Sequence, residues 1–321
     1  MRVKQWLASA ALAVAAFAGL VVPSMAQQSA APVATVVIAP VERTLEDVAW
    51  LIEAVNVQGF SGLVKVMGDS YTTGLDKSKP MGVIVTLEEG MPKALVCLPN
   101  LNHKEFFEKL SEASLQVDEL GKDLYEVAVG PQLLVAKVTK DWIFVGQNEE
   151  AVENVPKNPS ELFGDYHTRY TMSVKIDLQQ IPDELKETAI ENLRAGFEGA
   201  MQNAPGQTEE QKEAAAEMGE LQMAQIEEMI NSTQQVVLGW QIDSGKQQVY
   251  LDGAVLYTAG SKLAKQMEAQ ANLKSGFTGL TLPGSSVDVR FTSLATNEDD
   301  KKVAKQSMEN SLNQMEAQLE N

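Results

Sequence analysis

Apolar residues recur along the chain with two different spacings, and each spacing predicts its own kind of element. From Thr44, which can cap the segment, apolar residues return every three or four positions, at Leu45, Val48, Leu51, Ile52 and Val55. This spacing predicts an amphipathic helix. The next apolar run, 63–67, is short and β-prone, and it precedes Gly68-Asp69-Ser70. It predicts a strand that ends in a polar loop containing Ser70.

The region from residue 82 to residue 147 is predicted to consist mainly of strands. Two β-rich runs, 82–90 and 92–100, meet at Gly90-Met91-Pro92 and predict a hairpin. A short helix capped by Asn102 follows. Further β-rich runs separated by turn residues then predict a meander of short strands, at 114–120, 123–129, 132–139 and 141–147.

The second half begins with a predicted strand, 169–178, and continues with two long helices. Helical spacing predicts the first at about residues 182–201. The second starts at a capping box formed by Thr208 and Gln211 and runs to about residue 230. Beyond this long α-hairpin the pattern predicts two strands, a helix, another strand and a terminal helix, at 234–243, 247–257, 261–273, 285–295 and from Asn297 onward.

This order of elements predicts an α+β fold, because strands and helices are mixed without strict alternation. We expect two lobes of antiparallel or mixed sheet with packed helices, at residues 41–160 and 165–321, the second containing the long helical hairpin 182–231. Residues 27–40, rich in small residues and proline, are expected to be a linker. Both halves contain a hairpin followed by a helix, but the sequence shows no repeat strong enough to indicate duplication.

The first 26 residues have the composition of an export signal. Arg2 and Lys4 precede an apolar core, and small residues at Ser24 and Ala26 predict cleavage after Ala26. Gln27 follows the expected cut, so the lipid-bearing cysteine of a lipoprotein is not present there. The expected location is the periplasm or the exterior of the cell, with no membrane span after cleavage.

The net charge of the chain limits the classes of partner that we expect. The formal net charge is −18, and it becomes −20 when Arg2 and Lys4 are removed. Such a surface repels nucleic acid and anionic membranes, so we expect neither as a partner.

Cys97 is the only cysteine. It lies in the apolar run "ALVCLP", where a buried, inert thiol is expected.

Ser70 is the one candidate nucleophile, because "GDS" with the preceding β-prone run resembles the nucleophile turn of a GDS-type serine esterase. A serine hydrolase also needs a base and oxyanion donors. The chain has two histidines, His103 and His167, and neither follows an aspartate by three residues as in those esterases. The Gly-x-Asn-Asp block is also missing. We therefore expect no catalytic residue, with hydrolysis by Ser70 as an alternative.

The second long helix carries a stripe of acidic side chains at helical spacing, with apolar strips beside it. A solvated face is the simplest interpretation, and a docking surface for a basic partner or for cations is the alternative. No metal-binding motif and no cofactor are predicted. The stripe consists of Glu210, Glu213, Glu217, Glu220, Glu227 and Glu228.

Four longer stretches of the sequence, taken in order, carry a resemblance to a known family. They are "TTGLDKSKPMGVIV", "ALVCLPNLNHKEFFEKL", "KVTKDWIFVGQNEEAVENVPKNPSELF" and "KIDLQQIPDELKETAIENLRAGFEGAM". With the loop Gly74-x-Asp76-x-x-x-Pro80, this order resembles a family of exported proteins of unknown function from planctomycete-type bacteria. The resemblance covers roughly residues 44–275 and implies a bacterial envelope or extracellular location. It implies no activity and no catalytic residue.

These observations together favour an exported protein that is not an enzyme and has a binding or envelope-structural role, with an unidentified protein or envelope component as partner. Two alternatives remain at this point. One is a GDS-type hydrolase that uses Ser70, and the other is an acidic module that binds cations or a basic partner.

Overall fold

The computed structural model describes residues 31–270, apart from residues 58, 89 and 203–208, together with residues 302 and 305. The chain divides into two compact units. The first consists of Met1–Pro182 and Gln234–Leu256, and the second of Asp183–Thr233 and Tyr257–Asn321. Each unit is described by itself.

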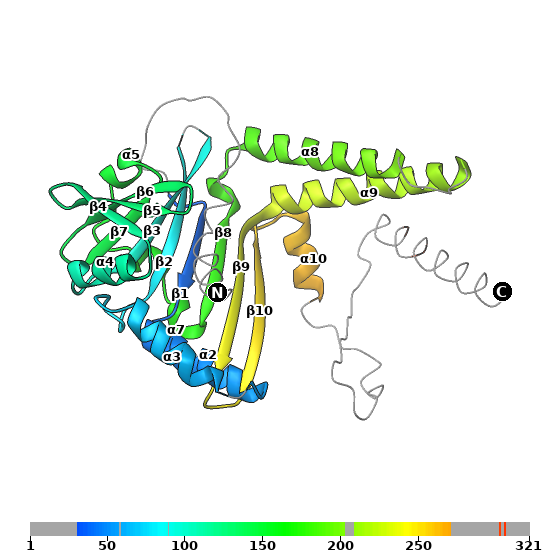
Figure 1. The fold of residues 1–321 in the computed structure, drawn as a ribbon. Coiled ribbons are helices and arrows are strands. Elements are labelled where there is room, and N and C mark those ends of the chain that lie inside the picture. The colour runs from blue at the N-terminus through cyan, green and yellow to red at the C-terminus, as the bar shows by residue number, and fades with distance from the viewer. Residues whose placement is uncertain are drawn as a thin grey trace. The chain divides into compact units, whose positions relative to one another are not determined.

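The first unit is built on one ten-stranded antiparallel sheet (Figure 1). Its strands lie in the order β10-β9-β8-β1-β2-β3-β7-β6-β5-β4. Their bounds are β1 Ala34–Ile38, β2 Met81–Glu88, β3 Met91–Pro99, β4 Gln116–Gly121, β5 Leu124–Val129, β6 Gln132–Val138, β7 Trp142–Gly146, β8 Met172–Asp177, β9 Thr233–Asp243 and β10 Gln248–Tyr257.

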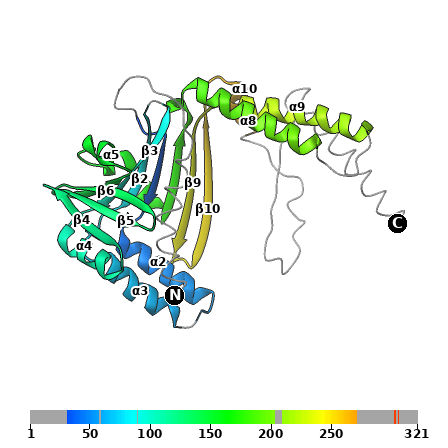
Figure 2. The same ribbon diagram turned by 45° about the horizontal axis from the view of Figure 1, so that its top comes forward.

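Short helices of this unit pack on both faces of the sheet (Figure 2). In the α4 helix, Phe106 and Phe107 pack on one face, while Val152 of α5 and Phe163 of α6 pack on the other. The helices are α2 Val41–Ala54, α3 Phe60–Tyr71, α4 His103–Glu112, α5 Glu149–Glu153, α6 Ser160–Phe163 and α7 Tyr166–Arg169, with a 3-10 turn at Leu178–Gln180.

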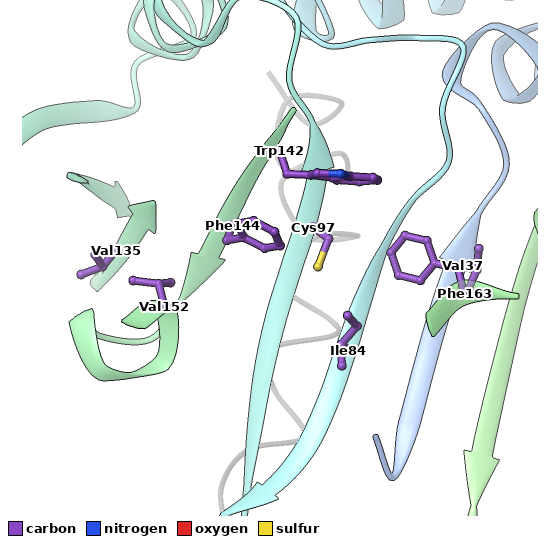
Figure 3. Close-up of a cluster of buried hydrophobic side chains, with 8 residues drawn as sticks. All are labelled: Val37, Ile84, Cys97, Val135, Trp142, Phe144, Val152 and Phe163. Carbon is purple, nitrogen blue, oxygen red and sulfur yellow. The ribbon is translucent and has the colours of Figure 1, made fainter. Parts of the chain in front are cut away.

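Strand periodicity divides the core into two clusters. In β7, Trp142 and Phe144 point to the cluster that contains Val37, Cys97 and Phe163 (Figure 3). Ile143, the residue between them, belongs to the cluster on the opposite face. Because side chains alternate across a strand, one short apolar strand can contribute to both cores.

The second unit contains α8 Asp183–Gln202, α9 Glu209–Ser232 and α10 Lys262–Gln270. Helices α8 and α9 run antiparallel, because Phe197 packs against Gly219 and Arg194 lies 3.4 Å from Glu227. A Cβ atom at Gly219 would overlap the Phe197 ring, so a larger residue at this position would displace that ring.

The expected mixture of helices and strands is confirmed, and the strands form one antiparallel sheet. One detail differs from the expectations: residues 34–38 of the expected linker form β1, in the middle of the sheet. Strands from both expected lobes belong to this one sheet, a point that the sequence pattern left open. The prediction of a linker gave weight to the small residues and proline at 27–40 and not to the alternation within "ATVVI". The strand expected at 285–295 lies outside the described residues, and of the terminal helix expected from Asn297 only Lys302 and Lys305 are described, both as helical.

The centre of the sheet contains a buried polar group, the hydroxyl of Thr35 in β1. Thr35 is 0% exposed, and its hydroxyl forms no hydrogen bond with any residue that the structure describes. We predict that Thr35→Val raises the free energy of unfolding by about 1 kcal/mol, because it removes an unsatisfied hydroxyl and keeps the β-branched shape. The midpoint of urea denaturation measures this change.

The matched control is Thr44→Val in α2. The Thr44 hydroxyl donates a hydrogen bond to Ala39 O at 3.1 Å. The same substitution there should lower the free energy of unfolding by about 1 kcal/mol. A loss of stability at both positions would contradict the assignment of Thr35 as an unsatisfied group.

Candidate functional site

Ser70 lies in the last turn of α3, and not in a loop after a strand. The prediction of a strand at 63–67 was wrong because it used β-propensity and ignored the helical spacing of Phe60, Val64, Met67 and Tyr71. Gly68, on the same helix, lies directly against the Leu45 side chain of α2. Packing of α3 against α2 therefore outweighs the β-propensity of residues 63–67.

The surroundings of Ser70 differ from those of a hydrolase nucleophile. Ser70 is exposed, and within the described part of the chain its hydroxyl forms no hydrogen bond. A nucleophile elbow places its serine at a sharp strand-to-helix turn, whereas Ser70 is near the end of a helix. The threonines after it, Thr72 and Thr73, donate to Gly68 O at 2.6 Å and to Asp69 O at 2.9 Å.

Both histidines contact groups other than Ser70. The His103 ring lies 6.2 Å from the Phe107 ring and 5.9 Å from the Tyr125 ring, on α4 and β5. The Nδ1 atom of His167, in α7, is 3.1 Å from Gly164 O. Neither ring forms a hydrogen bond with the Ser70 hydroxyl in the described residues. Neither histidine is therefore placed, within the described residues, to accept a proton from Ser70.

The loop after α3 is fixed by backbone contacts with the turn between β3 and α4. Gly74 O accepts hydrogen bonds from Leu101 N at 3.0 Å and Asn102 N at 2.8 Å, and Asp76 N donates to Pro99 O at 3.0 Å. Gly74 has a φ of +88°, and a Cβ atom there would collide with backbone atoms of Asn102 and Phe106. The position therefore needs glycine for both conformation and space.

Asp76 holds the second half of this loop. It accepts hydrogen bonds from Ser78 Oγ at 2.6 Å and Ser78 N at 3.2 Å, and it lies 3.0 Å from Lys79 Nζ. The Ser78 hydroxyl, with Lys79, lowers the pKa of the Asp76 carboxyl. A lowered pKa stabilises the fold above the unfolded-state pKa, and this contribution disappears as the pH falls through the folded-state value. The contacts of Gly74 and Asp76 thus give the loop a structural role.

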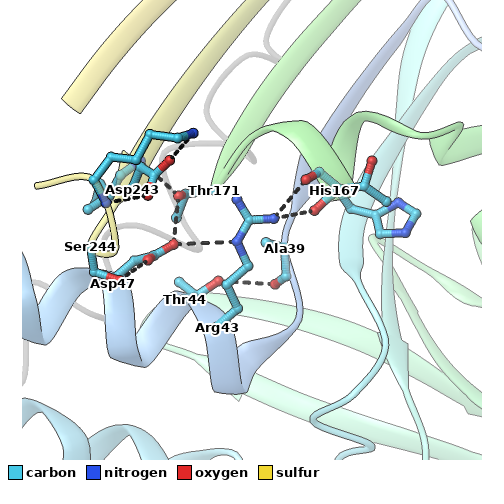
Figure 4. Close-up of polar contacts among 11 residues, drawn as sticks. Ala39, Arg43, Thr44, Asp47, His167, Thr171, Asp243 and Ser244 are labelled. Carbon is cyan, nitrogen blue, oxygen red and sulfur yellow. Dashed lines mark hydrogen bonds and ion pairs between the residues drawn. The ribbon is translucent and has the colours of Figure 1, made fainter. Parts of the chain in front are cut away.

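Figure 4 shows a polar cluster that the sequence did not indicate. Asp47 of α2 is 5% exposed, and it accepts hydrogen bonds from Thr171 Oγ1 at 3.1 Å and Ser244 Oγ at 3.3 Å. Arg43 lies 3.5 Å from Asp47 and donates to His167 O and Thr168 O. The four-residue spacing of Arg43 and Asp47 was the only sequence signal, since the other partners are more than 100 residues away.

This cluster attaches α2 to the residues that flank β8 and β9. Thr171 also accepts a hydrogen bond from Ile242 N at 3.1 Å, so its hydroxyl is engaged twice. The Asp47 carboxylate is held between a guanidinium and two hydroxyls, which compensates for its burial. Its role is the attachment of α2 to β8 and β9.

The acidic residues predicted on α9 do not form one uniform set. Side chains of Glu210, Glu213 and Glu217 lie outside those that the structure describes. Glu220 is exposed. Glu227 pairs with Arg194 of α8 at 3.4 Å, and Glu228 accepts a hydrogen bond from Ser232 Oγ at 2.8 Å. The last two therefore have partners within their own unit.

An open groove of about 550 Å³ lies between α8 and α9. Its two cationic side chains each have an acidic partner: Lys186 lies 2.9 Å from Asp183, and Arg194 pairs with Glu227. Glu187 and Glu191, one helical turn apart on α8, form no ion pair among the described residues. These two residues were not among the acidic residues that the sequence pattern indicated. Their surplus negative charge makes the groove suitable for a positively charged group.

Cys97 is 0% exposed in the core beside Phe144 and Ile84, and this burial raises the pKa of its thiol. Within the described residues, no group of three or more His, Cys, Asp or Glu side chains is arranged to hold a metal ion. No helix in the described part of the chain has both the length and the apolar character needed to cross a membrane.

We predict that Gly74→Ala lowers the free energy of unfolding more than Gly59→Ala. Both glycines have positive φ, +88° at Gly74 and +75° at Gly59, but nothing surrounds a Cβ atom at Gly59. Gly59→Ala should lower the free energy of unfolding by about 1–2 kcal/mol, because alanine is strained at positive φ. Gly74→Ala should cost about 1–3 kcal/mol more, because the new methyl group collides with backbone. Equal losses in urea denaturation would contradict the close packing of this loop.

Comparison with known proteins gives no match to any family model, any curated protein or any solved structure.

Proposed function

We propose that this chain is an exported, non-catalytic binding protein whose groove between α8 and α9 receives a basic segment of a partner. The observation that carries the proposal is the pair Glu187 and Glu191. Among the described residues these two glutamates have no ion-pair partner, while both cations of the groove are paired with acidic side chains. The finer architecture, a sheet lobe with a long helical hairpin as a separate binding element, belongs to the same proposal.

The electrostatics of the groove support a cationic ligand. Two glutamates at i and i+4 on a helix repel one another, which costs about 0.2–0.5 kcal/mol. A lysine or arginine side chain between them would convert this repulsion into attraction. Because both side chains are exposed, the attraction should weaken as salt increases.

The export signal supports a location outside the cytoplasm. Residues 1–26 have the charge and apolar pattern of a signal peptide, and the resemblance to exported planctomycete-type proteins points in the same direction. The proposed partner is therefore a protein or an envelope component in the periplasm or outside the cell.

The non-catalytic part of the proposal is supported by the surroundings of Ser70, which lies near the end of a helix and, in the part of the chain that the structure describes, forms no hydrogen bond to a base. We predict that a fluorophosphonate probe does not label the protein at a stoichiometric level. Intact-protein mass spectrometry measures the labelling, with Ser70→Ala as the control. Stoichiometric labelling that disappears in Ser70→Ala would replace this proposal with a serine hydrolase.

We predict that a fluorescent lysine-rich peptide binds the protein and that the double substitution Glu187→Gln/Glu191→Gln weakens binding at least tenfold. Fluorescence anisotropy at low salt measures the dissociation constant. The matched control is Glu42→Gln/Glu46→Gln, an exposed pair with the same spacing on α2. This control removes the same charge and should change affinity by less than twofold.

Equal weakening by both double variants would mean that net charge alone attracts the peptide, which contradicts a site in the groove. Isothermal titration with calcium tests the remaining alternative, in which the groove binds cations and not a peptide. Micromolar calcium binding that is lost in Glu187→Gln/Glu191→Gln, without peptide binding, would make the groove a cation site in place of a docking site.

A further inference from the structure

One side of strands β1, β8 and β9 is made of apolar residues. Val36 of β1 lies opposite Val174 of β8, and Val174 lies opposite Leu238 of β9. Residues directly opposite one another share a face of the sheet, and so do residues two positions apart along a strand. We call this surface the open face, and it consists of Ala34, Val36, Ile38, Met172, Val174, Ile176, Val236, Leu238 and Trp240.

The open face does not follow the usual division between a buried apolar side and an exposed polar side. Leu238 is 49% exposed, Trp240 38% and Met172 37%. On the opposite side of the same strands, Thr35 and Ser173 are polar and almost completely buried. In an antiparallel sheet with one solvated side, the solvated side is normally the polar one. Exposed apolar surface in this position marks an interaction site.

The open face continues into a surface that a helix covers. Val36 lies opposite Val83 of β2, which lies opposite Val96 of β3. Val96 in turn lies opposite Val145 of β7, which packs against the core cluster that contains the two phenylalanines of α4. In the part of the chain that the structure describes, none of the open-face residues belongs to either core cluster. The α4 helix therefore covers one part of this side of the sheet, and the open face is another part of the same side.

The dimensions of the open face fit a single helix. Strands lie about 4.8 Å apart, so β1, β8 and β9 together are about 14 Å wide, and the residues of β1 span about 16 Å. An α-helix about 10–12 Å wide and three turns long matches a surface of this size. A stable contact between two copies of a chain needs about 800 Å² from each copy, whereas the open face measures roughly 220 Å².

The backbone beneath the open face favours a helix over an extended peptide. The strands β1, β8 and β9 each have a neighbouring strand on both sides, so their backbone groups are already hydrogen-bonded. An extended segment lying across them would lose the hydrogen bonds between its own backbone and water without replacement. A helix satisfies its backbone groups internally and contacts the sheet through side chains alone.

The residue types on the open face favour a protein partner. Met172 and Trp240 lie directly opposite one another, and both are exposed. Aromatic residues and methionine are enriched at the centres of protein–protein interfaces. The formal net charge of −18 makes the protein a poor ligand for an anionic membrane.

We propose that the open face binds an amphipathic helix of a protein partner, one that carries bulky apolar side chains at helical spacing. Its chemistry matches that of α4, in which Phe106, Phe107 and Leu110 pack onto the covered part of the same side of the sheet. The open face belongs to the first unit, whereas the groove beside Glu187 and Glu191 belongs to the second. The protein thus has a second binding surface, for a different kind of ligand.

The test uses the full chain and a peptide that copies α4. The probe is a fluorescein-labelled peptide of residues 102–113, kept helical by a hydrocarbon staple in place of Lys104 and Glu108. These two side chains are exposed on α4, whereas Phe106 and Phe107 are buried. The stapled peptide is negatively charged, so charge does not attract it to the acidic protein.

We expect saturable binding that Leu238→Asp weakens about tenfold or more, because this change places a carboxylate against an apolar helix. Fluorescence anisotropy measures the dissociation constant. The matched control is Leu133→Asp on β6, where the side chain is 59% exposed and lies outside the open face. This control should change the affinity less than twofold.

Two further variants separate the open face from other causes of binding. Glu187→Gln/Glu191→Gln should leave the affinity for this peptide unchanged, because these residues belong to the groove in the second unit. A peptide with Phe106→Ala/Phe107→Ala has the same charge and should bind at least tenfold more weakly, because it loses its apolar contacts.

Cysteine labelling gives a measurement that does not depend on a charged variant. In Leu238→Cys, saturating peptide should slow maleimide labelling at least fivefold, while labelling of Leu133→Cys stays unchanged. Cys97 is 0% exposed and does not compete for the reagent. Intact-protein mass spectrometry follows the reaction.

Four results would overturn the proposal. The first is a lack of saturable binding, and the second is equal weakening by Leu238→Asp and Leu133→Asp. The third is a dimer of the free protein that Leu238→Asp converts to monomers, which would assign the open face to a second copy of the chain. The fourth is flotation with phosphatidylcholine vesicles that is lost in Leu238→Asp, without peptide binding, which would assign the face to a lipid surface.

Discussion

The backbone pairing of β1 with two neighbours is the constraint on which the sheet depends. This strand has only five residues, yet it pairs along its whole length with β2 on one side and β8 on the other. It joins strands that come from distant parts of the sequence. Thr35 and Val37 are almost completely buried, so the register of β1 is specified by its alternation.

The contacts around α2 and α3 show how this sheet positions the surrounding loops. Asp47 accepts hydrogen bonds from the residue after β9 and from the residue before β8, and Gly74 accepts two backbone hydrogen bonds from the turn before α4. Polar groups in these places are satisfied by residues far away in sequence, which makes the sheet and its connections one cooperative structure. Ser70, between them, is a surface residue of the helix that links these two anchors.

The helical unit has a different physical character. Its helices approach closely at Gly219, and its charged side chains lie on an exposed surface where individual ion pairs contribute little to stability. The charged side chains on this surface are therefore available to bind a partner. In the sheet unit, β10 is the last strand among the described residues, and it carries exposed apolar side chains such as Leu251 and Val255.

The sequence by itself determined the class of the fold, most strands, the long helices, the buried thiol and the acidic balance, because periodicity, burial and charge act locally. Two local inferences failed: residues 63–67 form helix because α2 packs against Gly68, and residues 34–38 form a strand because two neighbouring strands pair with them. Only the tertiary structure decided the order of the strands, the partners of Asp47 and the groove beside Glu187 and Glu191. The reason is physical: such contacts join residues far apart in the chain, and a local pattern carries no information about which distant partner supplies a hydrogen bond or a counter-charge.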